Sequence, residues 1–175
     1  MPPRAQHPVR RVVLLAAALT LAIAARAPAT MVTRMALDGV TREAARIVHA
    51  TVVAVRSGRD QSGLPATWVT LDVVRALKGP RTRQITVKQY GTATPLADGT
   101  VTRVAGLPSY KVGEELVLFL RGESHLGFTS PVGFGQGKYR VARRGPRPRV
   151  RRDLPDGSSQ DLDEFLAQVE ALAGP

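Results

Sequence analysis

The pattern of apolar and polar positions predicts that the middle of the chain is built from short β-strands. Residues 47–56 are rich in β-branched side chains and precede a turn-forming run at residues 57–63. Residues 67–74 then alternate apolar with polar positions, so the two segments predict a long hairpin. Further strands are predicted at residues 84–90, 100–104, 115–121, 128–132 and 137–142. The strand at 115–121 contains five consecutive apolar residues, which predicts a central strand buried on both faces.

Helical periodicity flanks this β region on both sides. Residues 38–46 predict a short helix, because apolar residues recur there at helical offsets. Residues 161–173 predict an amphipathic helix that begins at the N-cap Asp161 and ends at Gly174. Between the β region and this second helix, residues 143–159 are rich in Pro, Arg and Gly and show no periodicity, which is typical of an extended, mobile linker.

The first 29 residues have the three-part pattern of a secretion signal. Three arginines precede the uncharged apolar run at residues 12–25, and small residues follow it. At ~1.5 Å per residue, these 14 residues are too short for a helix to cross a hydrocarbon core of ~30 Å. The run therefore favours a cleaved signal over the alternatives, which are a buried helix or an uncleaved anchor. Ala27-Pro28-Ala29 and Ala22-Ile23-Ala24 both fit a cleavage motif.

These patterns divide the chain into a signal peptide (1–29), a β-barrel domain (30–142), a basic linker (143–159) and a C-terminal helix (160–175). Turns at hairpin spacing separate the strands, which argues against a parallel α/β fold. The expected fold class is therefore mainly β, with the strands forming a small antiparallel barrel or sandwich between a short N-terminal helix and an amphipathic C-terminal helix.

Two segments carry a resemblance to a known fold: VRALKG at residues 74–79 and GEELVLFL at residues 113–120. Together with the order of the strands, they resemble exported bacterial proteins of uncharacterised function with a β-barrel like the OB-type barrel of the netrin/TIMP module. The resemblance covers about residues 37–142 and implies an OB-like, closed or partly open barrel. TIMP inhibitors use an N-terminal cysteine and disulfides. Because this chain has no cysteine, their inhibitory mechanism is not carried over.

The charge of the chain is strongly positive, at +11, and part of the surplus is local. Eight basic residues and no acid lie between positions 138 and 152. They are our candidate anion-contact residues: Lys138, Arg140, Arg143, Arg144, Arg147, Arg149, Arg151 and Arg152. Such a cluster attracts polyanions, and the alternative is a merely solvated linker. The predicted export favours anionic lipids, lipopolysaccharide or acidic polysaccharide over nucleic acid as the partner.

No pattern in the sequence predicts a catalytic or metal site. The two histidines that follow the predicted signal, His49 and His125, lack the spacing of zinc ligands, and no Gly-x-Ser-x-Gly motif is present. Glu114 and Glu115 are adjacent on a strand and are expected to point to opposite faces. The glycine-rich run at residues 133–137 precedes a strand rather than a helix, which disfavours a phosphate-binding loop.

The sequence therefore favours a periplasmic or secreted, non-enzymatic binding module without a cofactor. Its expected partner is an envelope or extracellular protein or an anionic polymer. The alternative is a small exported hydrolase or a protease-inhibitor-like protein with its site around residues 91–99 and 133–137, and a purely structural envelope component is a third reading. The hydrolase hypothesis requires His49 or His125 to lie within hydrogen-bond reach of a serine or an acid in one pocket.

The signal prediction has a direct test. We expect that the protein exported by a bacterial host begins at Thr30, because Ala27-Pro28-Ala29 places small residues before that position. Intact-mass spectrometry of the exported protein gives its first residue. A mass that includes the whole apolar run at residues 12–25 would contradict cleavage.

Overall fold

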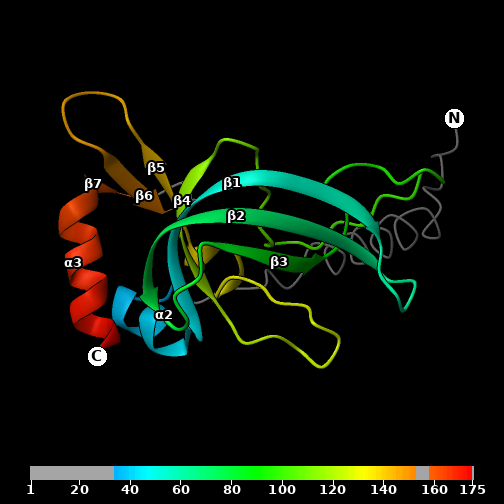
Figure 1. Ribbon diagram of the computed structural model, residues 1–175, viewed down its shortest axis with the longest axis horizontal. Coiled ribbons are helices and arrows are strands. Elements are labelled where there is room, and N and C mark those ends of the chain that lie inside the picture. Colours follow the sequence, from blue (N-terminus) through cyan, green and yellow to red (C-terminus); the bar gives the residue numbers. More distant parts are fainter. Residues whose placement is uncertain (1–33, 153–157, 175) are drawn as a thin grey trace, which may run out of the picture. The chain divides into compact units, whose positions relative to one another are not determined.

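The computed structural model describes residues 34–152 and 158–174 (Figure 1). The predicted signal peptide, residues 1–29, lies outside the described residues. The described chain forms one antiparallel sheet of seven strands in the order β3-β2-β1-β4-β5-β6-β7. Two α-helices accompany the sheet, α2 (Leu37–Glu43) before it and α3 (Leu162–Ala173) after it. The mainly β class and both flanking helices predicted from the sequence are therefore confirmed.

The predicted long hairpin is formed by β1 (Arg46–Arg59) and β2 (Pro65–Lys78). The turn between them is fixed by Asp60, whose Oδ1 accepts hydrogen bonds from the backbone N–H groups of Ser62 and Leu64. The pairing register shifts at three places along β1, and such bulges bend a strand and increase its twist. Figure 1 shows the result, a pair of long, strongly curved strands with β3 (Gln84–Tyr90) beside them.

The central position predicted for residues 115–121 is also confirmed. Strand β4 (Glu115–Leu120) lies in the middle of the sheet, between β1 and β5 (Lys138–Ala142). Its apolar run is continuous because successive side chains enter two different cores. Val117 and Phe119 face one core, and Leu116, Leu118 and Leu120 face the other.

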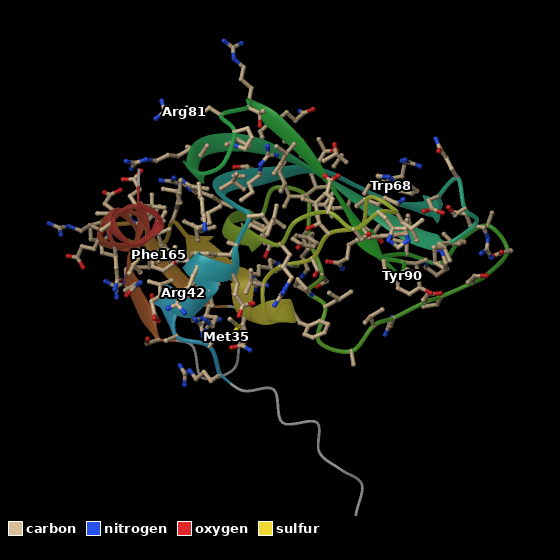
Figure 2. All side chains as sticks on the ribbon, turned by 90° about the horizontal axis from the view of Figure 1, so that it is seen from below. Met35, Arg42, Trp68, Arg81, Tyr90 and Phe165 are labelled. Carbon is tan, nitrogen blue, oxygen red and sulfur yellow. The ribbon has the colours of Figure 1, made fainter. Side chains whose placement is uncertain are left out.

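The helix-side core lies between the sheet and the two helices. Phe119 of β4, Tyr139 of β5 and Phe165 of α3 form its aromatic centre, with Tyr139 and Phe165 ring centroids 4.8 Å apart. Figure 2 shows Phe165 beneath α3, at the end of the domain away from Trp68 and Tyr90. Helix α3 begins as predicted, with the Asp161 side chain accepting from the backbone N–H groups of Asp163 and Glu164. None of the described helices is long and apolar enough to cross a membrane.

The loop-side core lies on the opposite face of the sheet. It includes Val52 of β1, Leu71 of β2, Val87 of β3 and Leu118 of β4. Tyr110, from the long segment between β3 and β4, packs into the same cluster. That segment, residues 91–112, is called the roof loop below.

A closed barrel is not present. Strands β3 and β7 (Ser159–Asp161) are the two edges of the sheet and do not pair with each other. The sheet is therefore open. The connection at residues 121–131, which follows β4 in the chain, lies against the edge strand β3, and its Thr129 N–H donates to the carbonyl of Lys88 at 2.9 Å.

Three local predictions differ from the structure. Residues 100–104 do not form a strand, and the predicted strand at 128–132 is reduced to a single bridge between Leu120 and Pro131. The predicted linker at 143–159 contains β6 (Arg149–Arg152) and the start of β7, and β6 pairs along its length with β5. Periodicity missed β6 because its inward positions are held by one apolar residue, Val150, and by an arginine, Arg152.

Candidate functional site

The structure divides the eight predicted anion-contact residues into buried, paired and free groups. Lys138 has a side chain that is 0% exposed, although it carries a charge. Its Nζ lies 2.8 Å from Glu114 Oε1 and donates to the backbone carbonyl of Ser109 at 2.6 Å. The same ammonium group lies 4.8 Å from the centre of the Tyr110 ring. Lys138 is thus a buried cation that is held by partners within its own chain.

Arg152, another of the eight predicted residues, is also buried. Its Nε donates to the Tyr139 hydroxyl at 3.0 Å, and its Nη1 donates to the carbonyl of Met35 at 2.9 Å. Burial raises the pKa of Tyr139, and the adjacent Arg152 partly opposes that rise. The guanidinium therefore ties β6 to β5 and to the segment that leads into α2.

Three more of the eight are exposed but engaged. Arg140 Nε lies 2.8 Å from Glu114 Oε1. Arg143 binds the Glu115 carboxylate through Nε and Nη2, both at 2.6 Å. Arg149 Nη2 donates to the carbonyl of Ser159 at 2.6 Å and so joins β6 to β7.

Arg144, Arg147 and Arg151 form the remaining group, which we call the hairpin arginines. They lie on the turn between β5 and β6 and on β6 itself, and all three are exposed. Within the described residues, no hydrogen bond or ion pair engages their side chains. Arg151 also lies directly across from Arg140 in the β5–β6 register. Two like charges at that spacing repel each other, so an anion bound there would be favoured.

The adjacent acids Glu114 and Glu115 point to opposite faces of the sheet, as predicted. Glu114 meets Lys138 and Arg140, whereas Glu115 meets Arg143 and His49. His49 is buried on β1, and its Nε2 lies 2.7 Å from Glu115 Oε1. Burial opposes ionisation of the Glu115 carboxyl, but the hydrogen bonds from Arg143 and His49 outweigh burial and hold its pKa below the ordinary value.

The His49–Glu115 pair bears on the hydrolase hypothesis. The histidine reaches an acid, as that hypothesis requires, but Glu115 is its hydrogen-bond partner among the described residues and no serine hydroxyl is. Neither residue lines any of the cavities described below. His125 is exposed on the 121–131 connection. The arrangement orients a carboxylate between two basic groups, but it does not supply a nucleophile.

Within residues 34–152 and 158–174, no three His, Asp or Glu side chains lie close enough together to hold a metal ion.

The glycine-rich run at residues 133–137 forms the short 3₁₀ helix η1 (Phe134–Gly137). Phe134 takes a left-handed backbone conformation with φ 59° and is 49% exposed, so it forms a surface tip rather than filling the core.

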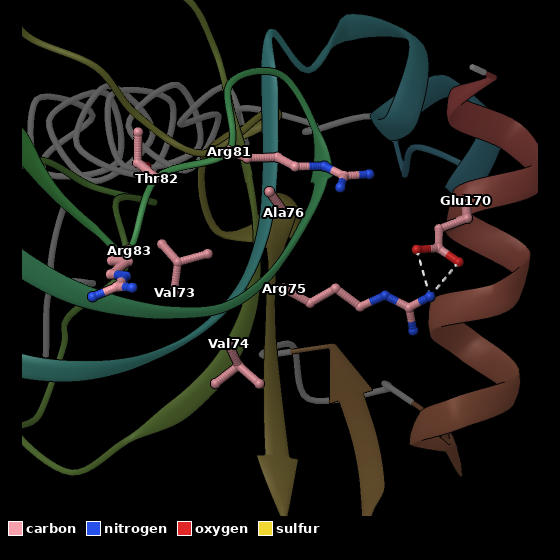
Figure 3. A pocket seen from close by; sticks show the side chains of 8 residues that line it. All are labelled: Val73, Val74, Arg75, Ala76, Arg81, Thr82, Arg83 and Glu170. Carbon is pink, nitrogen blue, oxygen red and sulfur yellow. Dashed lines mark hydrogen bonds and ion pairs between the residues drawn. The ribbon is translucent and has the colours of Figure 1, made fainter.

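A basic hollow lies between the β2–β3 turn and α3 and was not foreseen from the sequence (Figure 3). It has a volume of about 460 Å³ and is lined by Arg75, Arg81, Arg83 and Glu170, among others. Arg75 is tied to Glu170 at 2.7 Å, which cancels much of its charge. Figure 3 shows Arg81 pointing toward α3 and Arg83 pointing away from it. Because the two guanidinium groups diverge, they do not converge on a single anion.

A second cavity, of about 480 Å³, lies beneath the roof loop. Gln89, Tyr90, Leu107 and Tyr110 are among the residues that line it. Tyr90 and Leu107 also line a neighbouring cavity of about 350 Å³ that reaches Phe134. The loops at 91–99 and 133–137 singled out in the sequence therefore do border cavities. Gln89 itself was missed, although a glutamine at an inward strand position after Ile85 and Val87 is a readable signal.

The buried ion pair predicts a large effect of a small substitution. We expect that Glu114→Gln lowers the free energy of unfolding by about 3–5 kcal/mol, because it removes the carboxylate of an ion pair whose lysine side chain is fully buried. Urea unfolding measures the loss. The control is Glu43→Gln, which removes an exposed ion pair with Arg121 and should cost less than about 1 kcal/mol. Equal effects of the two substitutions would contradict the structural role of the pair.

The lowered pKa of Glu115 predicts an acid-dependent part of the stability. The ionised carboxylate stabilises the folded state above its ordinary pKa of 4.5, and this contribution is lost as pH falls through the lower pKa of the folded state. Wild type should therefore be more stable than Glu115→Gln near neutral pH, and the difference should shrink between about pH 5 and about pH 3. Urea unfolding at a series of pH values tests this, and a difference that stays constant would contradict it.

No family model, curated protein or solved structure matches this chain. What the protein binds must therefore be inferred from its own exposed charges and cavities.

Proposed function

We propose that this chain is an exported, non-enzymatic binding module that contacts an anionic polymer of the cell envelope through its hairpin arginines. The observation that carries the proposal is the exposure of Arg144, Arg147 and Arg151 without a partner among the described residues. They lie on one hairpin, whose other basic residues are paired or buried. The N-terminal signal pattern supports a location at which such polymers occur.

Electrostatics explains why this hairpin, rather than the chain as a whole, is the proposed contact. Many of the other exposed arginines face a nearby acid, as Arg42 faces Asp38 and Arg59 faces Asp98. Such pairs contribute little net field at a distance. The hairpin instead carries Arg144, Arg147 and Arg151 with no acid paired to them among the described residues, so their positive charge is not cancelled. A polyanion would gain from both the attraction and the release of its counter-ions.

The OB-like barrel type belongs to the same proposal. Three contacts bring β3 against the 121–131 connection and so support a partly open barrel. Thr129 N–H donates to the Lys88 carbonyl, Lys88 Nζ donates to the Leu126 carbonyl, and the Tyr90 and Phe128 rings meet edge to face at 5.8 Å. In this arrangement the hairpin arginines lie on the exposed side of the β5–β6 hairpin, so an anion can bind to them without distorting the cores.

The test is a charge-neutralised variant of the full chain. Replacing Arg144, Arg147 and Arg151 with Gln should weaken binding to polygalacturonate, an acidic polysaccharide, by about a hundredfold at low salt, since each basic residue contributes on the order of 1 kcal/mol near an anionic surface. Wild-type binding should fall steeply with added salt, and the variant should show a shallower slope. Binding is measured by titration calorimetry.

The matched control replaces Arg56, Arg81 and Arg83 with Gln, which removes the same charge from exposed arginines outside the hairpin. In the described parts of the chain, no hydrogen bond or ion pair engages these three side chains. We expect the control to keep most of the wild-type affinity. Equal losses in the two variants would show a response to net charge alone and would contradict a hairpin site.

A further inference from the structure

The cavity beneath the roof loop contains a buried acceptor that the protein itself does not satisfy. Gln89 lies on β3, is 8% exposed and lines the cavity. Its Nε2 donates to the carbonyl of Pro108 at 3.1 Å. This bond fixes which end of the amide is nitrogen, because a carbonyl can only accept. The Oε1 atom is thereby directed elsewhere, and among the described residues no group donates to it.

An acceptor in this state is costly and therefore informative. A buried carbonyl oxygen without a hydrogen bond loses its hydration without compensation, and such atoms are rare in native proteins. The two neighbouring inward positions of β3, Ile85 and Val87, are apolar and contribute to the loop-side core. An apolar residue at position 89 would fit that pattern, so packing alone does not account for the glutamine.

The cavity is held in shape by the backbone of the roof loop. Thr92 N–H donates to the Thr102 carbonyl at 2.8 Å, and Thr67 Oγ1 donates to the Gly91 carbonyl at 2.8 Å. Gly91 has φ 98°, and a side chain there would come within 2.8 Å of the Thr102 carbonyl oxygen. Only glycine allows the two ends of the loop to approach this closely. The space of about 480 Å³ is therefore largely preformed, as in other small-ligand sites.

The other lining residues define the chemistry that fits this space. Val104, Leu107 and Pro108 supply apolar walls. Arg103 and Lys111 are exposed lining residues, and neither side chain has an ionic partner within the described part of the chain. The lining contains no Asp or Glu. The cavity thus combines a buried acceptor, apolar walls and exposed positive charge.

We propose that this cavity binds a small organic anion that carries an N–H or O–H donor and an apolar group. The donor of the ligand hydrogen-bonds to Gln89 Oε1, the apolar group packs against Val104 and Leu107, and the carboxylate faces Arg103 and Lys111. This site is distinct from the hairpin arginines, and it does not depend on the anionic polymer proposed above.

Probes that differ in one feature test the proposal on the full chain. N-acetyl-phenylalanine carries a carboxylate, one amide N–H and an apolar ring. Its N-methylated form lacks the donor, and its methyl ester lacks the charge without adding a donor. We expect saturable binding of the first probe, seen as shifts of the Val104 and Leu107 methyl signals in NMR spectra, and about tenfold weaker binding of each of the other two. Equal affinities, or no saturable shift with any probe, would overturn the proposal.

Variants then assign the preference to named residues. Gln89→Leu should abolish the preference for the N–H probe over the N-methylated probe, whereas Gln84→Leu, on the same strand but outside the cavity, should keep it. Lys111→Met should reduce the preference for the carboxylate over the methyl ester. If Gln89→Leu unfolds, Gln89→Met supplies the same comparison. A donor preference that survives loss of the Gln89 amide would overturn the assignment of Oε1 as the acceptor.

Discussion

The burial of the Lys138 ammonium group is the constraint on which the two candidate sites depend. A lysine that is entirely removed from water must find a counter-charge and further acceptors, since an unpaired buried ion costs several kcal/mol. Glu114 supplies the charge and the Ser109 carbonyl supplies an acceptor. Ser109 belongs to the roof loop, and Lys138 is the first residue of β5. One buried ammonium group therefore holds the roof loop, through Ser109, and the start of β5 at the same point.

The allocation of the two acids then decides which cations remain available. Glu114 is shared by Lys138 and Arg140, and Glu115 is held by Arg143 and His49. Once these pairs are made, neither carboxylate is left for Arg144, Arg147 or Arg151, and no other acid of the described chain forms an ion pair with them. A run of basic residues that looks uniform in the sequence is thus divided by two carboxylates at the start of β4. The buried members stabilise the fold, and the exposed members produce the field.

Sequence patterns were sufficient where each face of an element carried one kind of residue. The hairpin of β1 and β2, the central strand β4 and the N-cap of α3 followed from alternation, from a continuous apolar run and from Asp161. They were insufficient where a polar side chain takes an inward position. Arg152 points into the helix-side core because the Tyr139 hydroxyl and the Met35 carbonyl accept hydrogen bonds from it. The inward positions of β6 are therefore not all apolar, and the strand shows no alternating apolar pattern. Partners of this kind come from residues that are distant in the sequence, so no local pattern predicts them.

Gln89 belongs to the same class of exception, but its consequence differs. For Arg152 and Lys138, the fold supplies partners for the buried polar groups, which makes these residues structural. For Gln89, the fold satisfies the amide nitrogen through Pro108 and leaves the buried oxygen without a donor among the described residues. A half-satisfied amide holds the roof loop and also presents an acceptor to a ligand. Recognition in this cavity would combine shape, one enclosed hydrogen bond and two exposed cations, whereas recognition at the hairpin would depend on charge alone. The two sites should therefore respond differently to salt, because an enclosed hydrogen bond is screened far less than exposed charges are.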